Sequence, residues 1–172
     1  MKGLSIAVSA NDHSQGPRDA PITLVEYGDY QCPYCGAAYP VLKAVQRAMG
    51  TRMRFVFRNF PITESHPHAL AAARFAEAAA EGGKFWEAHD LLYARQDALA
   101  PDDLKAYASE LGLNKALLDA ADNGAFDHRI ESDFMGGVRS GVNGTPCLFI
   151  NGERYDGPVD VDSLIEFMTA LA

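Results

Sequence analysis

Two cysteines separated by two residues form the most reactive group in this sequence. Residues 32–35 read Cys-Pro-Tyr-Cys. Such a pair can close a small, reversible disulfide when the first cysteine lies at the N-terminus of a helix. There the unpaired amide groups and the positive end of the helix dipole stabilise a thiolate. The spacing therefore favours chemistry of the thiol–disulfide exchange type.

The flanking residues predict the strand-to-helix turn that this chemistry requires. Residues 22–27 are rich in β-branched and apolar side chains, which is typical of a buried strand. Residues 35–49 are rich in alanine and suit a helix. A second strand is expected at 53–57, so the three elements predict a βαβ unit with parallel strands and a right-handed crossover.

The rest of the chain predicts a block of helices and a second group of strands. Residues 9–21 are polar and turn-rich and are expected to form a loop. From about residue 66 to 140 the apolar side chains recur with helical spacing, which indicates some five helices. A strand at 147–150 and a returning strand at 154–155 then form a hairpin, followed by a final helix. The order predicts an α/β fold in which one mixed sheet is flanked by helices, in a single domain that contains the helical insertion.

Composition and charge limit the classes of protein to which the chain can belong. The chain has 172 residues and a net charge of -8. The acidic balance and the absence of a basic run argue against nucleic acid and anionic membranes as partners. Three cysteines are too few for a secreted disulfide framework. No apolar run reaches the length of a membrane span, and the apolar patch within residues 1–10 is shorter than a secretory core, so a cytoplasmic location is expected, or a periplasmic one if a leader has been removed.

Three features of the sequence resemble the thioredoxin superfamily and, within it, the DsbA-like domains. The first predicted strand leads directly into the cysteine pair, residues 141–146 end in Thr145-Pro146 just before the third strand, and helices are inserted between the two halves. The superfamily keeps a threonine or valine before a cis-proline at that point. The resemblance covers nearly all of residues 20–172, and it implies a thioredoxin fold and a thiol–disulfide oxidoreductase.

The resemblance also implies a role for each residue of the motif. Cys32, at the exposed end of the helix, would be the nucleophile, and Cys35, one turn further in, would resolve the mixed disulfide. Pro146 would leave the backbone of Thr145 open beside the sulfurs, so that a substrate chain can pair with it like a strand. The expected substrates are protein or small-molecule thiols and disulfides, together with an unidentified redox partner, and no metal or cofactor is implied.

The sequence departs from the DsbA pattern at two points. Pro33-Tyr34 is the dipeptide typical of glutaredoxins, whereas DsbA carries Pro-His, so the reduction potential stays open and glutathione is a candidate co-substrate. Cys147 directly follows the proline, where most relatives have no thiol. It is expected near Cys32 without an assigned role, although a small buried side chain is the simpler interpretation.

Glu26 is a charged residue on a strand that is expected to be central. It lies six residues before Cys32, and related proteins hold an acid beneath the cysteine pair. Glu26 is therefore a candidate to relay the proton of Cys35. The alternative is a solvated glutamate at the edge of the sheet, and the sequence favours neither interpretation.

Two other functions are compatible with the sequence. A glutathione-linked transferase or reductase can use the same fold, although kappa-type glutathione transferases depend on a serine at the position of Cys32. A non-enzymatic metal-binding or redox-sensing module would use Cys32, Cys35 and Cys147, with His66 and His68 as further zinc ligands. Zinc sites usually show two closely spaced ligand pairs, so helix-terminal or surface positions are the simpler interpretation of the two histidines.

Overall fold

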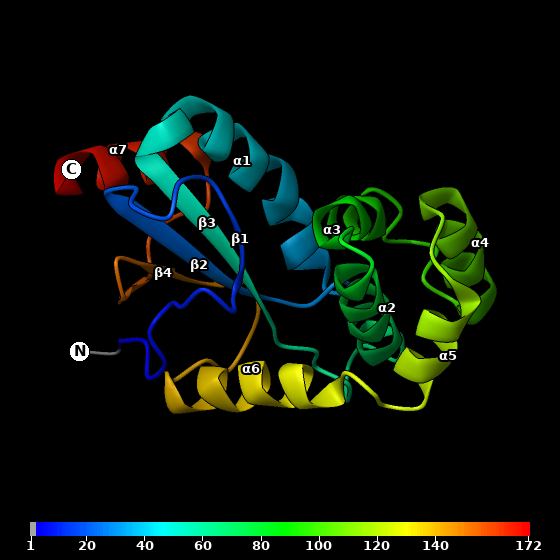
Figure 1. Cartoon of the computed structure of the whole chain (residues 1–172). Helices are drawn as coiled ribbons and strands as arrows, with labels where there is room; N and C mark the ends of the chain where they lie inside the picture. Colours follow the sequence, from blue (N-terminus) through cyan, green and yellow to red (C-terminus); the bar gives the residue numbers. More distant parts are fainter. Residues whose placement is uncertain (1–2) are drawn as a thin grey trace.

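The computed structural model describes residues 3–172 and contains a five-stranded mixed sheet with helices on both faces (Figure 1). The strands lie in the order β1-β3-β2-β4-β5. Their bounds are β1 His13–Gln15, β2 Ile22–Gly28, β3 Met53–Asn59, β4 Cys147–Ile150 and β5 Glu153–Tyr155. The predicted α/β fold with one mixed sheet is confirmed.

β2 lies at the centre of the sheet. It pairs in parallel with β3, with Ile22 opposite Met53, and antiparallel with β4, with Leu24 opposite Ile150. Helix α1 (Pro33–Met49) connects the two parallel strands, so the predicted βαβ unit is confirmed. Because helices cover both faces of the sheet, β2 is buried along almost its whole length.

The structure corrects the prediction for residues 9–21, which contain a short strand as well as loops. β1 pairs antiparallel with the outer edge of β3, with His13 opposite Phe57 and Gln15 opposite Phe55. The three residues of β1 are polar and lack the alternation of apolar side chains that identifies a strand. They form one only because β3 offers a free edge with unpaired backbone groups.

Seven helices surround the sheet within residues 3–172. Besides α1, they are α2 Ala69–Glu81, α3 Phe85–Ala94, α4 Pro101–Leu111, α5 Lys115–Asp122, α6 Asp127–Arg139 and α7 Val161–Leu171. Helices α1 and α7 pack together on one face of the sheet, α6 lies along the other face, and α2 to α5 form a block at one side (Figure 1). None of these helices is long and apolar enough to cross a membrane.

The sheet separates two apolar cores. Side chains alternate along a strand, so Leu24 and Leu148 pack on the face covered by α1, whereas Val25 and Phe149 pack on the face covered by α6. Both cysteines of the pair belong to the first core. The cysteine pair is thus anchored at the place where the sheet, α1 and the helical block meet.

Candidate active site

The two cysteines lie at the N-terminus of α1, shortly after the end of β2. Cys32 is the N-cap residue, and Pro33 occupies the first helical position, where a missing amide hydrogen costs nothing. Cys32 exposes 4% of its surface and Cys35 none, while Tyr34 between them is 75% exposed. The two sulfurs are not joined in a disulfide. The sequence predicts that Cys32 lies at an exposed end of the helix. In the structure Cys32 is almost fully buried, although it is the more accessible thiol of the pair.

The two sulfurs have opposite acid–base properties. The pKa of Cys32 is lowered to about 5, and the main cause is a hydrogen bond from the side chain of Cys35. This effect is larger than that of burial, which by itself would raise the pKa. The hydroxyl of Thr145 and the backbone amides of Cys35 and Tyr34 lower it further. Burial, and then the bond to Cys32, raises the pKa of Cys35 well above its usual range. At neutral pH Cys32 is therefore a thiolate and Cys35 a protonated thiol.

Thr145 and Pro146 lie next to this thiolate. The peptide bond between them is cis, and the carbonyl oxygen of Thr145 lies 3.6 Å from the sulfur of Cys32. The hydroxyl of Thr145 is buried and has no hydrogen-bond partner while Cys32 is a thiol. A buried donor without a partner is costly, and the thiolate is the acceptor that this hydroxyl lacks.

Glu26 is buried beneath the cysteine pair, so the interpretation as a solvated glutamate is wrong. It is 2% exposed on the central strand, and it shares the α1 face of β2 with Leu24 because side chains two apart point the same way. Burial, and then the charge of Cys32, raises the pKa of Glu26 to about 8. Its charge in turn contributes to the raised pKa of Cys35. The carboxyl group is thus electrostatically coupled to both sulfurs.

Asp29 holds the loop that leads from β2 to Cys32, and the sequence analysis did not identify it. Its buried carboxylate accepts hydrogen bonds from the amides of Gln31 and Ile62 and from Nδ1 of His66, each at 2.8 Å. Its backbone carbonyl accepts the amide of Cys32 at 3.1 Å. The sequence offers one local indication of this role: an aspartate directly after a strand is typical of a turn in which the aspartate side chain accepts a hydrogen bond from the backbone two residues on.

Gln96 is a second residue that the sequence analysis missed. It lies in the turn after α3, and its Nε2 donates to the carbonyl of Tyr30 at 3.0 Å and to the carbonyl of Cys32 at 2.7 Å. Nothing near Gln96 in the sequence indicates this role, because its partners lie more than sixty residues away.

Comparison with known proteins identifies the family of this chain. A family model described as Thioredoxin matches residues 9–170, which is almost the whole chain. The chain belongs to the thioredoxin family. Among solved structures this thioredoxin-family chain is similar to a thioredoxin-like oxidoreductase from Silicibacter pomeroyi DSS-3, at 26% identity and a TM-score of 0.83 over 94% of this chain and 92% of that one. It is also similar to oxidised BdbD from Bacillus subtilis, at 22% identity and a TM-score of 0.82 over 93% and 92%. The predicted DsbA-like thioredoxin fold is confirmed.

The curated relatives of this thioredoxin-family chain are longer proteins. It is 46% identical over 158 residues to Na(+)/H(+) antiporter NhaA 3 of Salinispora tropica, and 44% identical over 163 residues to Na(+)/H(+) antiporter NhaA 1 of Salinispora arenicola. These matches cover 89% and 92% of this chain but 24% of each relative. The chain thus spans about a quarter of the length of the curated relatives that it matches.

Cys147 is not in the apolar cluster that holds the cysteine pair of this thioredoxin domain. It is buried at the start of β4 and packs in the second core with Tyr27 and Phe149, whereas Cys32 and Cys35 belong to the first. The alternation of side chains along β4 is the reason. The structure agrees with the simpler interpretation of Cys147 as a small buried side chain.

The two histidines of the zinc alternative have other positions. His68 is the N-cap residue of α2, and its amide donates to Oε1 of Gln31 at 2.7 Å. His66 is not simply a surface residue, because it is paired with the buried Asp29. Within residues 3–172 no group of three or more His, Cys, Asp or Glu side chains is arranged to hold a metal ion.

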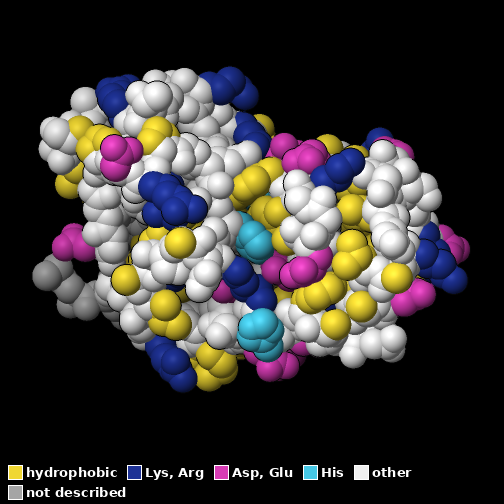
Figure 2. Space-filling model, viewed as in Figure 1, with side chains coloured by type: hydrophobic (Ala, Val, Ile, Leu, Met, Phe, Trp, Pro, Cys, Tyr) yellow, Lys and Arg dark blue, Asp and Glu magenta, His cyan; other side chains and the backbone are white. Residues whose placement is uncertain are grey.

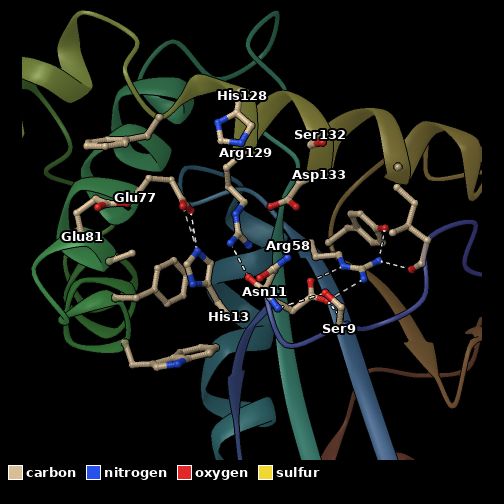
Figure 3. A pocket seen from close by; sticks show the side chains of 18 of the residues that line it. Ser9, Asn11, His13, Arg58, Glu77, Glu81, His128, Arg129, Ser132 and Asp133 are labelled. Carbon is tan, nitrogen blue, oxygen red and sulfur yellow. Dashed lines mark hydrogen bonds and ion pairs between the residues drawn. The ribbon is translucent and has the colours of Figure 1, made fainter.

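A cavity of about 710 Å³ lies between the sheet and the helical block, away from the cysteine pair, which does not line it (Figure 3). Figure 2 shows histidine, acidic and basic side chains gathered in this hollow. His13 of β1 bonds to Glu77 of α2 at 3.0 Å, and the amide of Asn59 donates to Glu77 and to Asp133 of α6, both at 3.0 Å. These bonds tie β1, β3, α2 and α6 together, so the network helps to fix the helical block against the sheet.

Proposed function

We propose that the chain is a thiol–disulfide oxidoreductase that exchanges disulfides through Cys32 and Cys35. One observation carries this proposal. Cys32, at the start of α1, has a pKa lowered to about 5 and receives a hydrogen bond from Cys35, whose own pKa is raised. Only a thiolate attacks a disulfide, and a second cysteine, which loses its proton only after the first attack, is needed to release the mixed disulfide.

The proposed reaction has two steps. The thiolate of Cys32 attacks one sulfur of a substrate disulfide, so a protein–substrate S–S bond forms and the other substrate sulfur leaves as a thiolate, which takes up a proton. The thiol of Cys35 then loses its proton and attacks the sulfur of Cys32, and the second substrate sulfur leaves. The substrate has gained two electrons and the protein has become the disulfide. The same steps run in reverse with an oxidised protein and a substrate dithiol, and the reduction potentials set the direction.

Glu26 is the proposed acceptor for the proton of Cys35. Its pKa of about 8 lies near neutrality, so the carboxyl group can both take up and release a proton at working pH. Its charge acts on Cys35, and as a buried group with Oε2 unpartnered it has a vacant lone pair to receive the proton. The resolving step would then be fastest when Glu26 is ionised.

The substrate chain is proposed to lie along Thr145 and Pro146. The carbonyl of Thr145 lies beside the sulfur of Cys32, and an extended peptide can pair with a free backbone segment in the manner of an added strand. Tyr34, which lies between the two cysteines in the sequence, is 75% exposed and is the proposed contact for a substrate side chain. The physiological substrate is therefore a protein or small-molecule disulfide or dithiol, and a separate redox partner restores the starting state.

Ion exchange by the antiporter relatives is not part of this proposal. The chain matches only about a quarter of each relative, so the activity in their names is not assigned to it. The solved relative with 26% identity is named as an oxidoreductase, which supports redox chemistry as the function of this chain. Glutathione is retained as a candidate reductant, because Pro33 and Tyr34 form the glutaredoxin-like dipeptide.

The test is turnover of a disulfide-linked peptide with dithiothreitol as electron donor. Cys32→Ser should abolish exchange, because no thiolate remains to attack. Cys35→Ser, incubated with the peptide in the absence of dithiothreitol, should accumulate a covalent protein–peptide adduct, seen by mass spectrometry, because the resolving thiol is missing. Cys147→Ala is the matched control that removes the third thiol and should keep turnover. Equal turnover in the Cys32→Ser and Cys35→Ser variants would contradict the proposal, and turnover with glutathione alone as donor would identify a glutathione-linked reductase.

A further inference from the structure

Gln96 reaches from the helical block to the backbone around the nucleophilic cysteine. Figure 1 shows α3, which the Gln96 turn follows, beside the N-terminal end of α1. The carbonyl of Cys32 accepts two hydrogen bonds, from the amide of Gly36 at 3.0 Å and from Nε2 of Gln96 at 2.7 Å. The first of these belongs to α1 itself, and the second comes from a residue 64 positions away. The N-cap residue is therefore fixed both by its own helix and by the inserted block.

Gly36 provides the space that this contact needs. A Cβ atom at Gly36 would overlap Oε1 of Gln96 and lie 2.8 Å from its Cδ, so any larger residue would displace the glutamine side chain. The backbone of Gly36 is helical, so its conformation does not require glycine. A glycine inside a helix is less stable than alanine at the same position. The close approach of Gln96 is the feature of the structure that accounts for this glycine.

We propose that Gln96 is a positioning residue, which holds the backbone of Tyr30 and Cys32 so that the sulfur stays over the amides that open α1. This inference rests on the proposed function. Asp29 accepts hydrogen bonds from the amides of Gln31 and Cys32 in the same loop, whereas Gln96 donates to the carbonyls of that loop. The amide group of Gln96 also offsets the negative ends of two carbonyl dipoles near a developing negative charge. The helical block is thereby coupled to the reactivity of the nucleophile.

The test is the pH titration of the Cys32 thiolate, followed by its ultraviolet absorbance, in the reduced full chain. The other titratable groups that act on this sulfur, Cys35 and Glu26, stay in place in every variant. Gln96→Met keeps the length of the side chain but cannot donate, so the carbonyl dipoles beside the thiolate are no longer offset and the pKa of Cys32 should rise, by about half to one unit. Gln96→Glu should raise it at least as much, because a carboxylate would face both carbonyls.

Gly36→Ala gives an independent variant that should shift the pKa of Cys32 in the same direction by displacing Gln96. Combined with Gln96→Met it should add little, because both changes remove one interaction. It also favours the helix, so it keeps the test valid if a Gln96 variant folds poorly. Asp97→Asn, an exposed change in the same turn, is the control and should leave the titration unchanged.

Two outcomes would count against the inference, and they differ. A low wild-type pKa that Gln96→Met, Gln96→Glu and Gly36→Ala all leave within about 0.2 units would overturn the role of Gln96 and leave the proposed function standing. A wild-type Cys32 that titrates like an ordinary thiol would contradict the proposed function itself, and the role of Gln96 with it.

Discussion

The sulfur of Cys32 lies 3.6 Å from the carbonyl oxygen of Thr145, although 113 positions separate the two residues in the sequence. The contact arises because β4 runs antiparallel to β2, with Cys147 opposite Tyr27. The loop that follows β2 and the loop that precedes β4 therefore meet at the same end of the sheet. This arrangement gives the thiolate its neighbours: the opening amides of α1 on one side and the Thr145 backbone and hydroxyl on the other.

Thr145→Val is expected to raise the pKa of Cys32 by about half to one unit. Valine keeps the shape of threonine but removes the buried hydroxyl that helps to lower this pKa. Thiolate absorbance against pH measures the shift. Thr169→Val, at an exposed position of α7, is the matched control and should cause no change. An unchanged titration in Thr145→Val would show that the hydroxyl does not stabilise the thiolate.

The rate of alkylation of Cys32 should depend on pH with a midpoint near 5. Below that midpoint the rate should fall about tenfold per pH unit, because only the thiolate reacts, and from pH 6 to 8 it should be almost flat. Cys35→Ala removes the largest contribution to the lowered pKa, so its midpoint should move upward. A wild-type profile that still rises steeply above pH 7 would contradict the assignment of Cys32 as an acidic thiol.

Glu26→Gln should make the protein more stable at neutral pH. The folded pKa of Glu26, about 8, lies above its ordinary value of 4.5, so between these values the unfolded chain binds fewer protons than the folded chain. Stability falls as pH rises through that window, by up to about 1.4 kcal/mol per pH unit. Glutamine removes this dependence, and urea unfolding at several pH values measures the difference from wild type.

Two checks accompany the Glu26 measurement. Cys32 contributes an opposite slope, because its folded pKa is lowered, and since Glu26 and Cys32 act on each other, the pKa of Cys32 is measured in both proteins and its contribution is subtracted from each. Glu87→Gln, at an exposed position, should leave the pH dependence of unfolding as it is in wild type. The Glu26→Gln variant should also resolve mixed disulfides more slowly if the carboxylate accepts the proton of Cys35; an unchanged rate would remove Glu26 from the mechanism.

Asp29→Ala should destabilise the fold by about 2–4 kcal/mol, measured as the free energy of unfolding in urea. The substitution leaves the amides of Gln31 and Ile62, and the ring of His66, without their buried acceptor. Asp19→Ala, at an exposed position without such partners, should stay within about 0.5 kcal/mol of wild type. A loss of similar size in both variants would mean that the Asp29 network does not hold the loop.

Local sequence patterns were sufficient wherever an element is defined by its own residues. The helix predicted at 35–49 begins at Pro33 and ends at Met49, and the strand predicted at 147–150 has those bounds. Glycine, proline and the spacing of apolar side chains influence secondary structure only within a few residues. Their effect can therefore be predicted without knowing the tertiary structure. β1 was missed for the opposite reason, since three polar residues become a strand only where β3 offers a free edge.

Local sequence patterns identified the candidate reactive groups, which are a cysteine pair at a strand-to-helix turn and Thr145-Pro146 before the third strand. The surroundings of these groups could be read only from the folded chain. Glu26 is buried because β2 is a central strand, and Cys147 joins the second core because of its place on β4. Asp29 and Gln96 hold partners far away in the sequence. Burial and hydrogen bonding between distant residues depend on which segments the fold brings together, and neither is written in the spacing of the residues themselves.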